Sequence, residues 1–223
     1  MKFTKLIAGL AVAVGLSACA SSGPISETAT RNTPDVAPVV AAELTARSAD
    51  WRLADVRVNV SGDLKVSEAN RYYPIADIVW REDPYGDRRA QVAKILDDGL
   101  TSGLTHLKGD RPVFFDIELS RFHSLSEKTR VSIGGVHNII YTLTVVDAAT
   151  GVALHGPIEM EIALKAFGGD QAFEAERRGQ TQKVRIQTHL ASLMRQAFNG
   201  GQEMRVVAQA AVAPLDVNSG ATQ

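Results

Sequence analysis

Alternating apolar and polar residues mark several stretches of the chain as β-strands with one buried face. Residues 51–60 carry valines at every second position, opposite charged or amide side chains, and residues 113–122 and 157–167 alternate in the same way. A period of two is typical of a half-buried strand, because successive side chains point to opposite faces of a sheet. Residues 138–146 are mainly β-branched or aromatic, which predicts a further strand. Turn residues at 147–151 join the last two strands in a hairpin.

Two other stretches repeat their apolar residues every three or four positions, which is typical of amphipathic helices. The first covers residues 88–105, and Asp87 stands where a helix N-cap is expected. The second covers residues 177–198 and is ended by the Asn-Gly-Gly sequence at 199–201. Residues 168–180 are predicted to form a charged loop or the lead-in to this second helix.

The predicted order is strand, helix, three strands, helix. This order favours an α+β fold with a single antiparallel-rich sheet of about four to five strands. Both amphipathic helices are expected to pack on one face of that sheet. The polar side chains that alternate along the strands would then leave the other face in contact with water.

The N-terminus has the layout of a secretory leader. Lys2 and Lys5 precede the apolar run Leu6–Leu16, which is much shorter than the roughly 20 residues needed to cross a bilayer. The sequence LSAC that follows resembles the bacterial lipoprotein box, in which the cysteine thiol takes a thioether-linked diacylglycerol. The resemblance implies that Cys19, the only cysteine in the chain, becomes the lipidated first residue of the mature protein. The alternative is a simple secretory signal with an incidental cysteine.

These features divide the chain into four predicted parts. Residues 1–18 are the lipoprotein signal peptide, and residues 19–48, rich in Ser, Thr, Ala and Pro, are a tether. The α+β domain covers residues 49–203, and residues 204–223 are a loose tail. The alanine after the lipidated cysteine, where an aspartate would imply retention in the inner membrane, favours the outer membrane. The domain is therefore expected to face the periplasm.

Composition and motifs narrow the possible functions. The formal net charge of −1 becomes −3 once the leader with its two lysines is removed, and the absence of a basic stripe argues against nucleic-acid binding. The five histidines are scattered, and no second cysteine is present to share a metal, so no metal site and no cofactor are predicted. The sequence contains no G-x-S-x-G nucleophile elbow. The expected partners are the membrane, through the anchor, and a protein of the cell envelope.

One segment concentrates the unusual residues: RYYPIADIVWREDPYGDRR at 71–89. A structural interpretation makes residues 75–80 a short strand at a sheet edge, with Trp80 over one end of the core. Arg71 or Arg81 would then pair with the nearby acids. The turn chemistry of residues 83–87 would lead into the first helix.

Two functional interpretations of this segment stand beside the structural one. Aromatic and arginine side chains dominate binding interfaces, so the segment is a candidate interaction surface for a protein, a glycan or a lipid headgroup. The candidate residues of that surface are Arg71, Tyr72, Tyr73, Trp80, Arg81 and Tyr85. The second interpretation is catalytic, since a glycosidase needs two carboxyl groups across its substrate. The candidate carboxylates are Asp77, Glu82, Asp83 and Asp87.

The segment VSEANRYYPIADIVWREDPYGDR resembles an uncharacterised family of small bacterial lipoproteins, known only as a domain of unknown function. The layout of anchored cysteine, tether, first strand and Arg/Trp segment before a helix is also similar to that of auxiliary lipoproteins of envelope lipid-transport systems. The resemblances imply a membrane-anchored periplasmic lipoprotein that acts as a non-enzymatic accessory or assembly factor. The alternative is a periplasmic hydrolase or glycan-binding module that uses carboxylates at 77–87.

Overall fold

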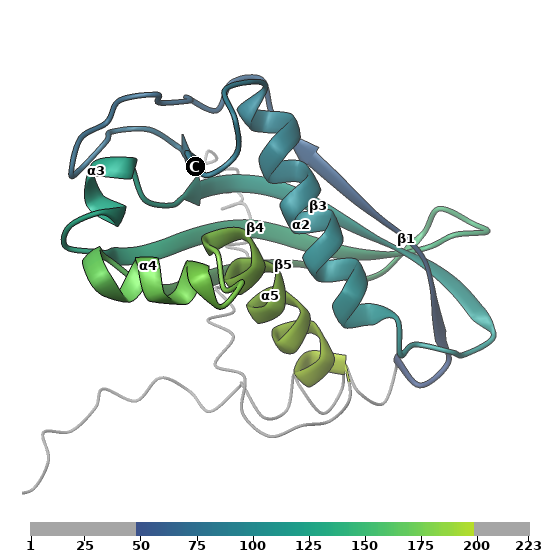
Figure 1. The fold of residues 1–223 in the computed structure, drawn as a ribbon. Helices are drawn as coiled ribbons and strands as arrows, with labels where there is room; N and C mark the ends of the chain where they lie inside the picture. Colours follow the sequence, from purple (N-terminus) through teal and green to yellow (C-terminus); the bar gives the residue numbers. More distant parts are fainter. Residues whose placement is uncertain (1–47, 199–223) are drawn as a thin grey trace, which may run out of the picture. The chain divides into compact units, whose positions relative to one another are not determined.

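A mixed sheet of five strands forms the centre of residues 48–198, the part of the chain that the computed structural model describes (Figure 1). Its strands are β1 (Trp51–Val60), β2 (Ile78–Val79), β3 (Arg111–His123), β4 (Gly135–Asp147) and β5 (Ala153–Ala166). The long strands lie in the order β1-β3-β4-β5. β3 and β4 pair antiparallel, as do β4 and β5, whereas β1 and β2 each run parallel to β3. The prediction of an α+β domain with a mostly antiparallel sheet is confirmed.

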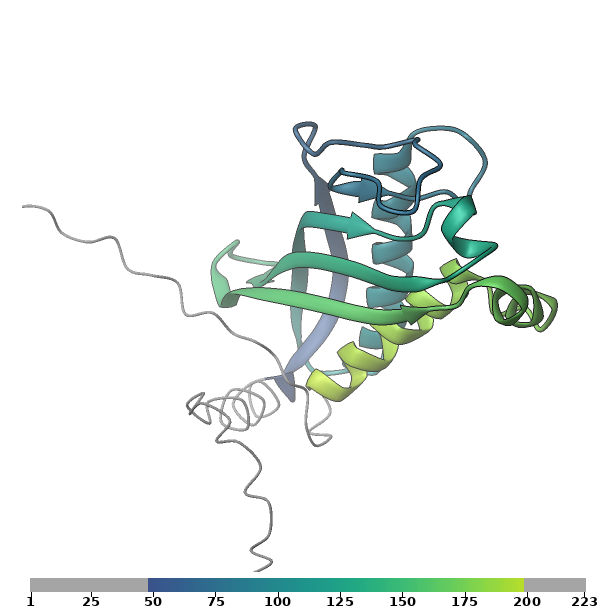
Figure 2. The same cartoon turned by 90° about the vertical axis from the view of Figure 1, so that its left-hand side faces the viewer.

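Helices cover one face of this sheet. The described helices are α2 (Arg88–Leu104), α3 (Glu127–Arg130), α4 (Gly169–Arg177) and α5 (Gln182–Phe198). The long α2 and α5 lie across the same face, as predicted for the two amphipathic helices (Figure 2). The short α3 and α4 lie together at one end of the sheet (Figure 1).

The apolar faces of strands and helices meet in one core. The alternation along β3 buries Phe115, Ile117 and Leu119, and the helical period of α2 buries Leu96 and Leu100 in the same cluster. Complete burial of a side chain of this size contributes about 1.5–3 kcal/mol. The periodic patterns in the sequence therefore correspond to the surfaces that hold the domain together.

Close packing of α2 against α5 depends on a glycine inside α2. A Cβ atom added to Gly103 would lie 2.6 Å from the carbonyl oxygen of Ala191 and 2.7 Å from the Cβ of Met194. Real Cβ atoms do not approach other atoms so closely, so a larger residue would push the helices apart. The cost of a glycine in a helix, about 1 kcal/mol relative to alanine, is thus offset by the closer packing.

The second predicted helix, over residues 177–198, corresponds to α5, which begins later than predicted, and a separate helix, α4, precedes it. α4 ends at Arg177 and α5 begins at Gln182, and most of the stretch 168–180 that was predicted as a loop or lead-in is α4. Gly179 has a φ of 72°, in the left-handed region that glycine adopts without steric cost. This residue ends α4 and turns the chain before α5 begins.

Several sequence predictions lie outside the described residues. These are the signal peptide, the lipidation of Cys19, nearly all of the tether and the C-terminal tail, all of which remain predictions. None of the helices described between residues 48 and 198 is long and apolar enough to cross a membrane.

Candidate functional site

The chain between β1 and α2, which we call the connecting segment (residues 61–87), is held by hydrogen bonds at its start and in its middle. Arg89 of α2 donates hydrogen bonds of 2.6–3.3 Å to three carbonyl oxygens of residues 61–64. Further along, the amide of Asp77 donates to the carbonyl oxygen of Lys65 at 3.0 Å, and its carboxylate accepts from the Lys65 amide at 2.8 Å. The segment is therefore held in one conformation although it contains little regular structure.

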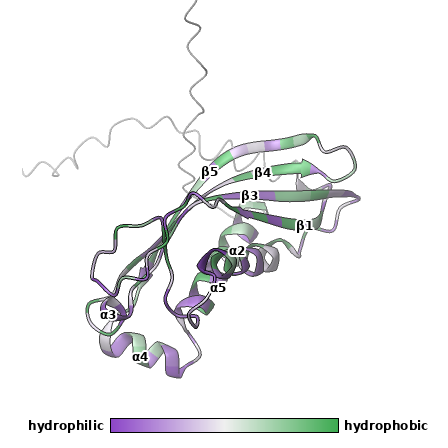
Figure 3. Ribbon diagram, turned by 90° about the horizontal axis from the view of Figure 1, so that it is seen from above, coloured by the Kyte–Doolittle hydropathy of each residue, from purple (hydrophilic) through white to green (hydrophobic). Residues whose placement is uncertain are grey.

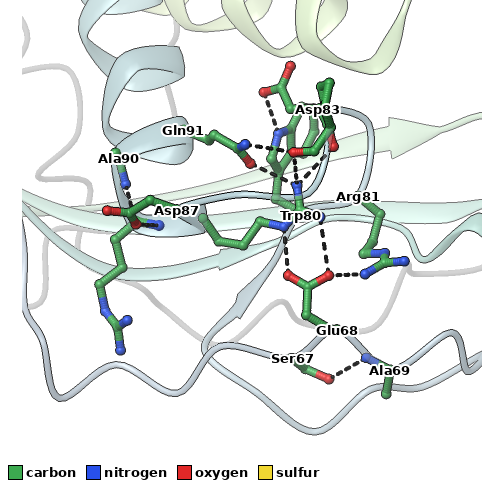
Figure 4. A network of polar contacts seen from close by, with 12 residues as sticks. Ser67, Glu68, Ala69, Trp80, Arg81, Asp83, Asp87, Ala90 and Gln91 are labelled. Atoms are coloured by element: carbon green, nitrogen blue, oxygen red, sulfur yellow. Dashed lines mark hydrogen bonds and ion pairs between the residues drawn. The ribbon is translucent and has the colours of Figure 1, made fainter.

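Glu68 is the centre of a polar network that joins the connecting segment to α2 and α3. Figure 4 shows the Glu68 carboxylate and its bond to Arg81. Its carboxylate accepts from Arg88 at 2.7 and 3.1 Å and from Arg81. Arg81 also donates to Glu127, in the first turn of α3, at 2.9 Å. The side chain of Arg88 is 3% exposed and donates to carbonyl oxygens of residues 83–84 as well. A buried guanidinium is tolerated only where it is fully paired, so this network fixes the middle of the segment.

Trp80 was predicted as part of the exposed interaction surface, and the structure contradicts this. Its side chain is 0% exposed, and its ring meets the Phe122 ring edge-on with 5.7 Å between centroids. Its Nε1 donates to the carboxylate of Asp83 at 2.7 Å. The physical reason is that β2 pairs with the end of β3 and directs the ring that follows it into the core. The structural interpretation of Trp80 is therefore confirmed.

The four carboxylates of the catalytic hypothesis each have a structural partner. Asp77 accepts the Lys65 amide as described above, Glu82 accepts the backbone amide of Lys183 at 2.8 Å, and Asp87 caps α2 by accepting two of its first amides at 3.0 and 3.1 Å. Asp83 pairs with the ammonium group of Lys183. Partial burial acts to raise the pKa of Asp83, but the hydrogen bonds from Lys183 and the tryptophan ring outweigh it and lower that pKa.

Arg81 pairs with two glutamates that were not among the nearby acids predicted as its partners. Its partners Glu68 and Glu127 lie 13 residues before it and 46 residues after it. Arg71, the other arginine considered, has no carboxylate partner among the described residues. Its backbone is bonded instead: the Arg71 amide donates to the carbonyl oxygen of Ala69 at 3.0 Å, and the Arg71 carbonyl accepts from the hydroxyl group of Ser126 at 2.6 Å.

Three exposed apolar side chains of the connecting segment (Tyr72, Tyr73 and Ile75), together with the cations Arg71 and Lys128, form what we call the aromatic tip. Ile75 is 99% exposed, Tyr73 is 83% exposed and Tyr72 is 40% exposed. Lys128 of α3 places its ammonium group 4.5 Å from the centre of the Tyr72 ring, within the range of a cation–π contact. The tip thus combines three apolar side chains with two cations.

The backbone of the tip is held by α3. The Ser126 hydroxyl group bonds the Arg71 carbonyl, and the Lys128 amide donates to the side-chain oxygen of Asn70 at 2.7 Å. Ser126 also caps α3 by accepting the Thr129 amide. The exposed side chains are therefore displayed from a fixed backbone.

Tyr85 belongs to a different surface, which we call the helical groove. This groove lies between α2 and α5, has a volume of about 510 Å³, and has the 86% exposed Tyr85 at its rim. The buried Ile95 lines its floor. The other lining residues are Asp83, Pro84, Ala90, Gln91, Lys94, Asp98, Lys183 and Gln187. Both lysines of the groove are paired, Lys183 with Asp83 and Lys94 with Asp98.

Hydrophilic and hydrophobic residues alternate along β1 and β3 (Figure 3). The polar residues of this alternation are the more exposed ones, as predicted for the uncovered face of the sheet. Arg57 of β1 donates two bonds to Asp116 of β3, at 2.5 and 2.6 Å, and its guanidinium lies 4.2 Å from the Phe114 ring centre. Asn59 donates to Glu118 at 2.6 Å in the same way. These cross-strand pairs line a shallow hollow of about 350 Å³. Their polar groups satisfy one another across the two strands.

A buried histidine links the start of α5 to the sheet. His137 on β4 is 0% exposed, and its Nδ1 lies 2.8 Å from the hydroxyl oxygen of Ser124, which donates to the Gln182 side chain at 3.3 Å. Burial, and after it the charge of the nearby Arg185, lower the pKa of His137 to about 3. The histidine is therefore neutral at pH 7. Residues 48–198 contain no cluster of His, Cys, Asp or Glu side chains placed to hold a metal.

Comparisons with known proteins give a family and two similar structures. A Xanthomonas campestris protein of family DUF330 is 9% identical, with a TM-score of 0.41, over 68% of this chain and 82% of that one. A Caulobacter crescentus protein proposed to be a lipoprotein is 12% identical, with a TM-score of 0.30, over 70% of this chain and 90% of that one. No curated protein matches the sequence. The model of a family of unknown function (DUF6778) matches residues 51–213, which confirms the resemblance to a domain of unknown function: the chain belongs to the DUF6778 family.

Proposed function

We propose that this chain is a lipid-anchored lipoprotein that acts without catalysis, as an accessory or assembly factor that docks an envelope protein at the helical groove. The observation that carries this proposal is the display of Tyr85, 86% exposed, at the rim of a groove between two packed helices. Tyrosine is among the residues that dominate protein interfaces. A groove with paired charges and an apolar floor suits a protein surface with an apolar side chain at its centre.

The fixed conformation of the connecting segment supports this docking role. Arg88 donates hydrogen bonds both to Glu68 and to the carbonyl oxygens of residues 83–84. These bonds hold the chain that leads directly to Tyr85 at the groove rim. A surface that is already ordered loses less conformational entropy when a partner binds. Tyr85 can therefore contribute to binding without first folding a loop.

The membrane anchor is inferred from the sequence. The leader ends in LSAC, so Cys19 is the proposed lipidated residue, and several acyl chains at about 0.8 kcal/mol per buried CH₂ make a lasting anchor. Ala20 after the cysteine favours the outer membrane over the inner one, with the domain in the periplasm. The alternative of a hydrolase or glycan-binding module has no observation in its favour, because each carboxylate at 77–87 has a structural partner.

In-cell photo-crosslinking tests the docking. A photoreactive residue replaces Tyr85 in the full-length protein, and a second variant carries it at Val152, which is 60% exposed at the β4–β5 turn. The proposal predicts one discrete protein adduct from position 85 that position 152 does not give. No adduct at 85 from a folded, acylated protein would contradict it, as would the same adduct from both positions. The intact mass of the wild-type chain and of Cys19→Ser tests the acylation separately.

A further inference from the structure

We propose that the aromatic tip rests on the surface of an anionic phospholipid bilayer, so that the domain contacts the membrane at a second point besides its lipid anchor. This inference relies on the anchoring proposed above, because the anchor keeps a bilayer within reach of the domain. It concerns a surface distinct from the helical groove. The shape of the tip, its charges and the path of the chain support it.

The shape of the tip suits a soft surface. Ile75 is 99% exposed and Tyr73 is 83% exposed, so both side chains protrude from the domain. A folded protein partner would have to supply a preformed pocket for each of these side chains. The interface of a bilayer yields around them instead, and tyrosine is enriched at that depth because its ring is apolar and its hydroxyl group polar.

The charges around the tip favour an anionic surface. Arg71 and Lys128 have no carboxylate partner among the described residues. Glu68 and Glu127 are paired with Arg81 and Arg88, so two positive charges balance the two negative ones. Asp77, another acid of the connecting segment, accepts the amide of Lys65. Two cations beside three exposed apolar side chains form the combination by which peripheral proteins bind anionic lipid.

The path of the chain allows the anchor and the tip to touch the same bilayer. The chain enters the domain at Ser48, which is bonded to Phe198 where β1 begins, and the tip lies in the segment that follows the other end of β1. The ten residues of β1 cover about 33 Å. The 29 residues from Cys19 to Arg47 can reach at most about 100 Å. The anchor therefore does not prevent the tip from reaching the membrane.

Tryptophan fluorescence of the full-length acylated protein in vesicles tests the contact. The natural Trp51 and Trp80 are 3% and 0% exposed, so a tryptophan introduced by Tyr73→Trp reports the tip against a constant background. In phosphatidylcholine–phosphatidylglycerol vesicles, its emission is expected to shift to shorter wavelength and to be quenched by brominated lipid. The matched control, Val152→Trp, is expected to show neither change.

The charge requirement is tested without the anchor. In the mature chain (residues 19–223) carrying Cys19→Ser, binding to phosphatidylglycerol vesicles is expected to exceed binding to pure phosphatidylcholine and to weaken with salt. Arg71→Gln and Lys128→Gln should each lower the partition coefficient about fivefold, the equivalent of about 1 kcal/mol for each basic residue at an anionic surface. Arg57→Gln, on the open face of the sheet, is the control and should leave the partition coefficient unchanged.

Two results would overturn the proposal. One is a tryptophan at position 73 that stays as exposed to water on vesicle-bound protein as the tryptophan at position 152. The other is equal partition into the two kinds of vesicle, or no effect of the two tip substitutions. A missing acyl mass on the wild-type chain would instead refute the anchor, and the Cys19→Ser measurements would still decide the contact of the tip.

Discussion

The aromatic tip and the helical groove both display tyrosines from one connecting segment, yet their surroundings differ. Tyr73 stands on a protruding tip with two cations, Arg71 and Lys128, that have no carboxylate partner within residues 48–198. Tyr85 stands at the rim of a groove in which each lysine is paired with an aspartate. The difference indicates that protrusion and charge balance, more than residue type, decide what an exposed tyrosine can bind. A convex cationic surface suits a bilayer, and a concave neutral one suits a protein.

The Glu68 network lies between these two surfaces and supports both. Arg88 extends from it toward residues 83–84 at the groove, and Arg81 extends toward α3, which holds the tip. Substitutions in the shared support should therefore disturb both surfaces together, and substitutions in either surface should separate them. The predictions that follow use this distinction.

The largest effect is expected for Trp80→Ala. Loss of a completely buried tryptophan should lower the free energy of unfolding by about 3–5 kcal/mol and release the connecting segment at both surfaces. Denaturant unfolding measures the loss of unfolding free energy. Hydrogen exchange over residues 61–87 measures the release of the connecting segment. As a control, Trp80→Phe keeps most of the packing and loses only the hydrogen bond to Asp83. Its free energy of unfolding should fall by about 1 kcal/mol. A near-neutral Trp80→Ala would mean that this side chain lies on the surface.

Glu68→Gln should lower the free energy of unfolding by about 2–3 kcal/mol. The value is below that for a fully buried ion pair because the Glu68 side chain is 34% exposed. Faster hydrogen exchange is expected at the tip and at the groove rim in the same variant. If only one of the two regions exchanged faster, the network would not be their common support.

Gly103→Ala should affect the groove and leave the tip unchanged. The added methyl group would collide with Ala191 and Met194 of α5, so we expect a loss of about 1–3 kcal/mol in unfolding free energy. The matched control is Gly62→Ala, where an added Cβ meets no atom within 4 Å. Vesicle binding by Gly103→Ala should equal that of the wild type, and reduced binding would contradict the independence of the two surfaces.

Acid should destabilise the domain through His137. Its folded-state pKa of about 3 lies below the ordinary 6.5, so the unfolded chain binds more protons as the pH falls below 6.5. This histidine therefore contributes stability that is present above pH 6.5 and lost as the pH falls toward 3, by at most about 1.4 kcal/mol per pH unit. His123 and His189, whose pKa values burial also lowers, add in the same direction. His137→Gln should flatten the pH dependence of the unfolding free energy measured between pH 7 and 5, and an unchanged slope would contradict this assignment.

The smallest effects on stability are expected at the exposed tyrosines. Tyr73→Ala and Tyr85→Ala should each change the free energy of unfolding by less than about 0.5 kcal/mol, because neither ring is buried. Their functional effects should differ. The first should weaken vesicle binding, and the second should weaken the partner adduct formed from a neighbouring photoreactive residue at Pro84.

Local periodicity predicted most of the fold. The first strand, Trp51–Val60, has the predicted bounds, and Asp87 caps α2 as expected. The pairing of strands could not be predicted in the same way, because the parallel contact between β1 and β3 joins residues about 60 positions apart. The break between α4 and α5 was missed because Gly179 was not recognised as a helix end inside a charged stretch.

The candidate site was located by composition, but its arrangement was not predicted. Tyr73 and Tyr85, two residues of the predicted interaction surface, are exposed, and their role in binding stays a prediction. The prediction missed Ile75, the most exposed side chain of the tip, because residues 75–80 were predicted to form a strand. The strand β2 covers only Ile78–Val79. The prediction also missed Glu68 and Lys128, whose roles depend on contacts that only the folded chain creates.

Photo-crosslinking in cells from positions 73 and 85, scored in one experiment for both protein and phospholipid adducts, tests the division between tip and groove most directly. The account predicts a phospholipid mass on the chain from position 73 and one discrete protein adduct from position 85. The same protein adduct from both positions would contradict it, because the two tyrosines would then belong to a single protein interface.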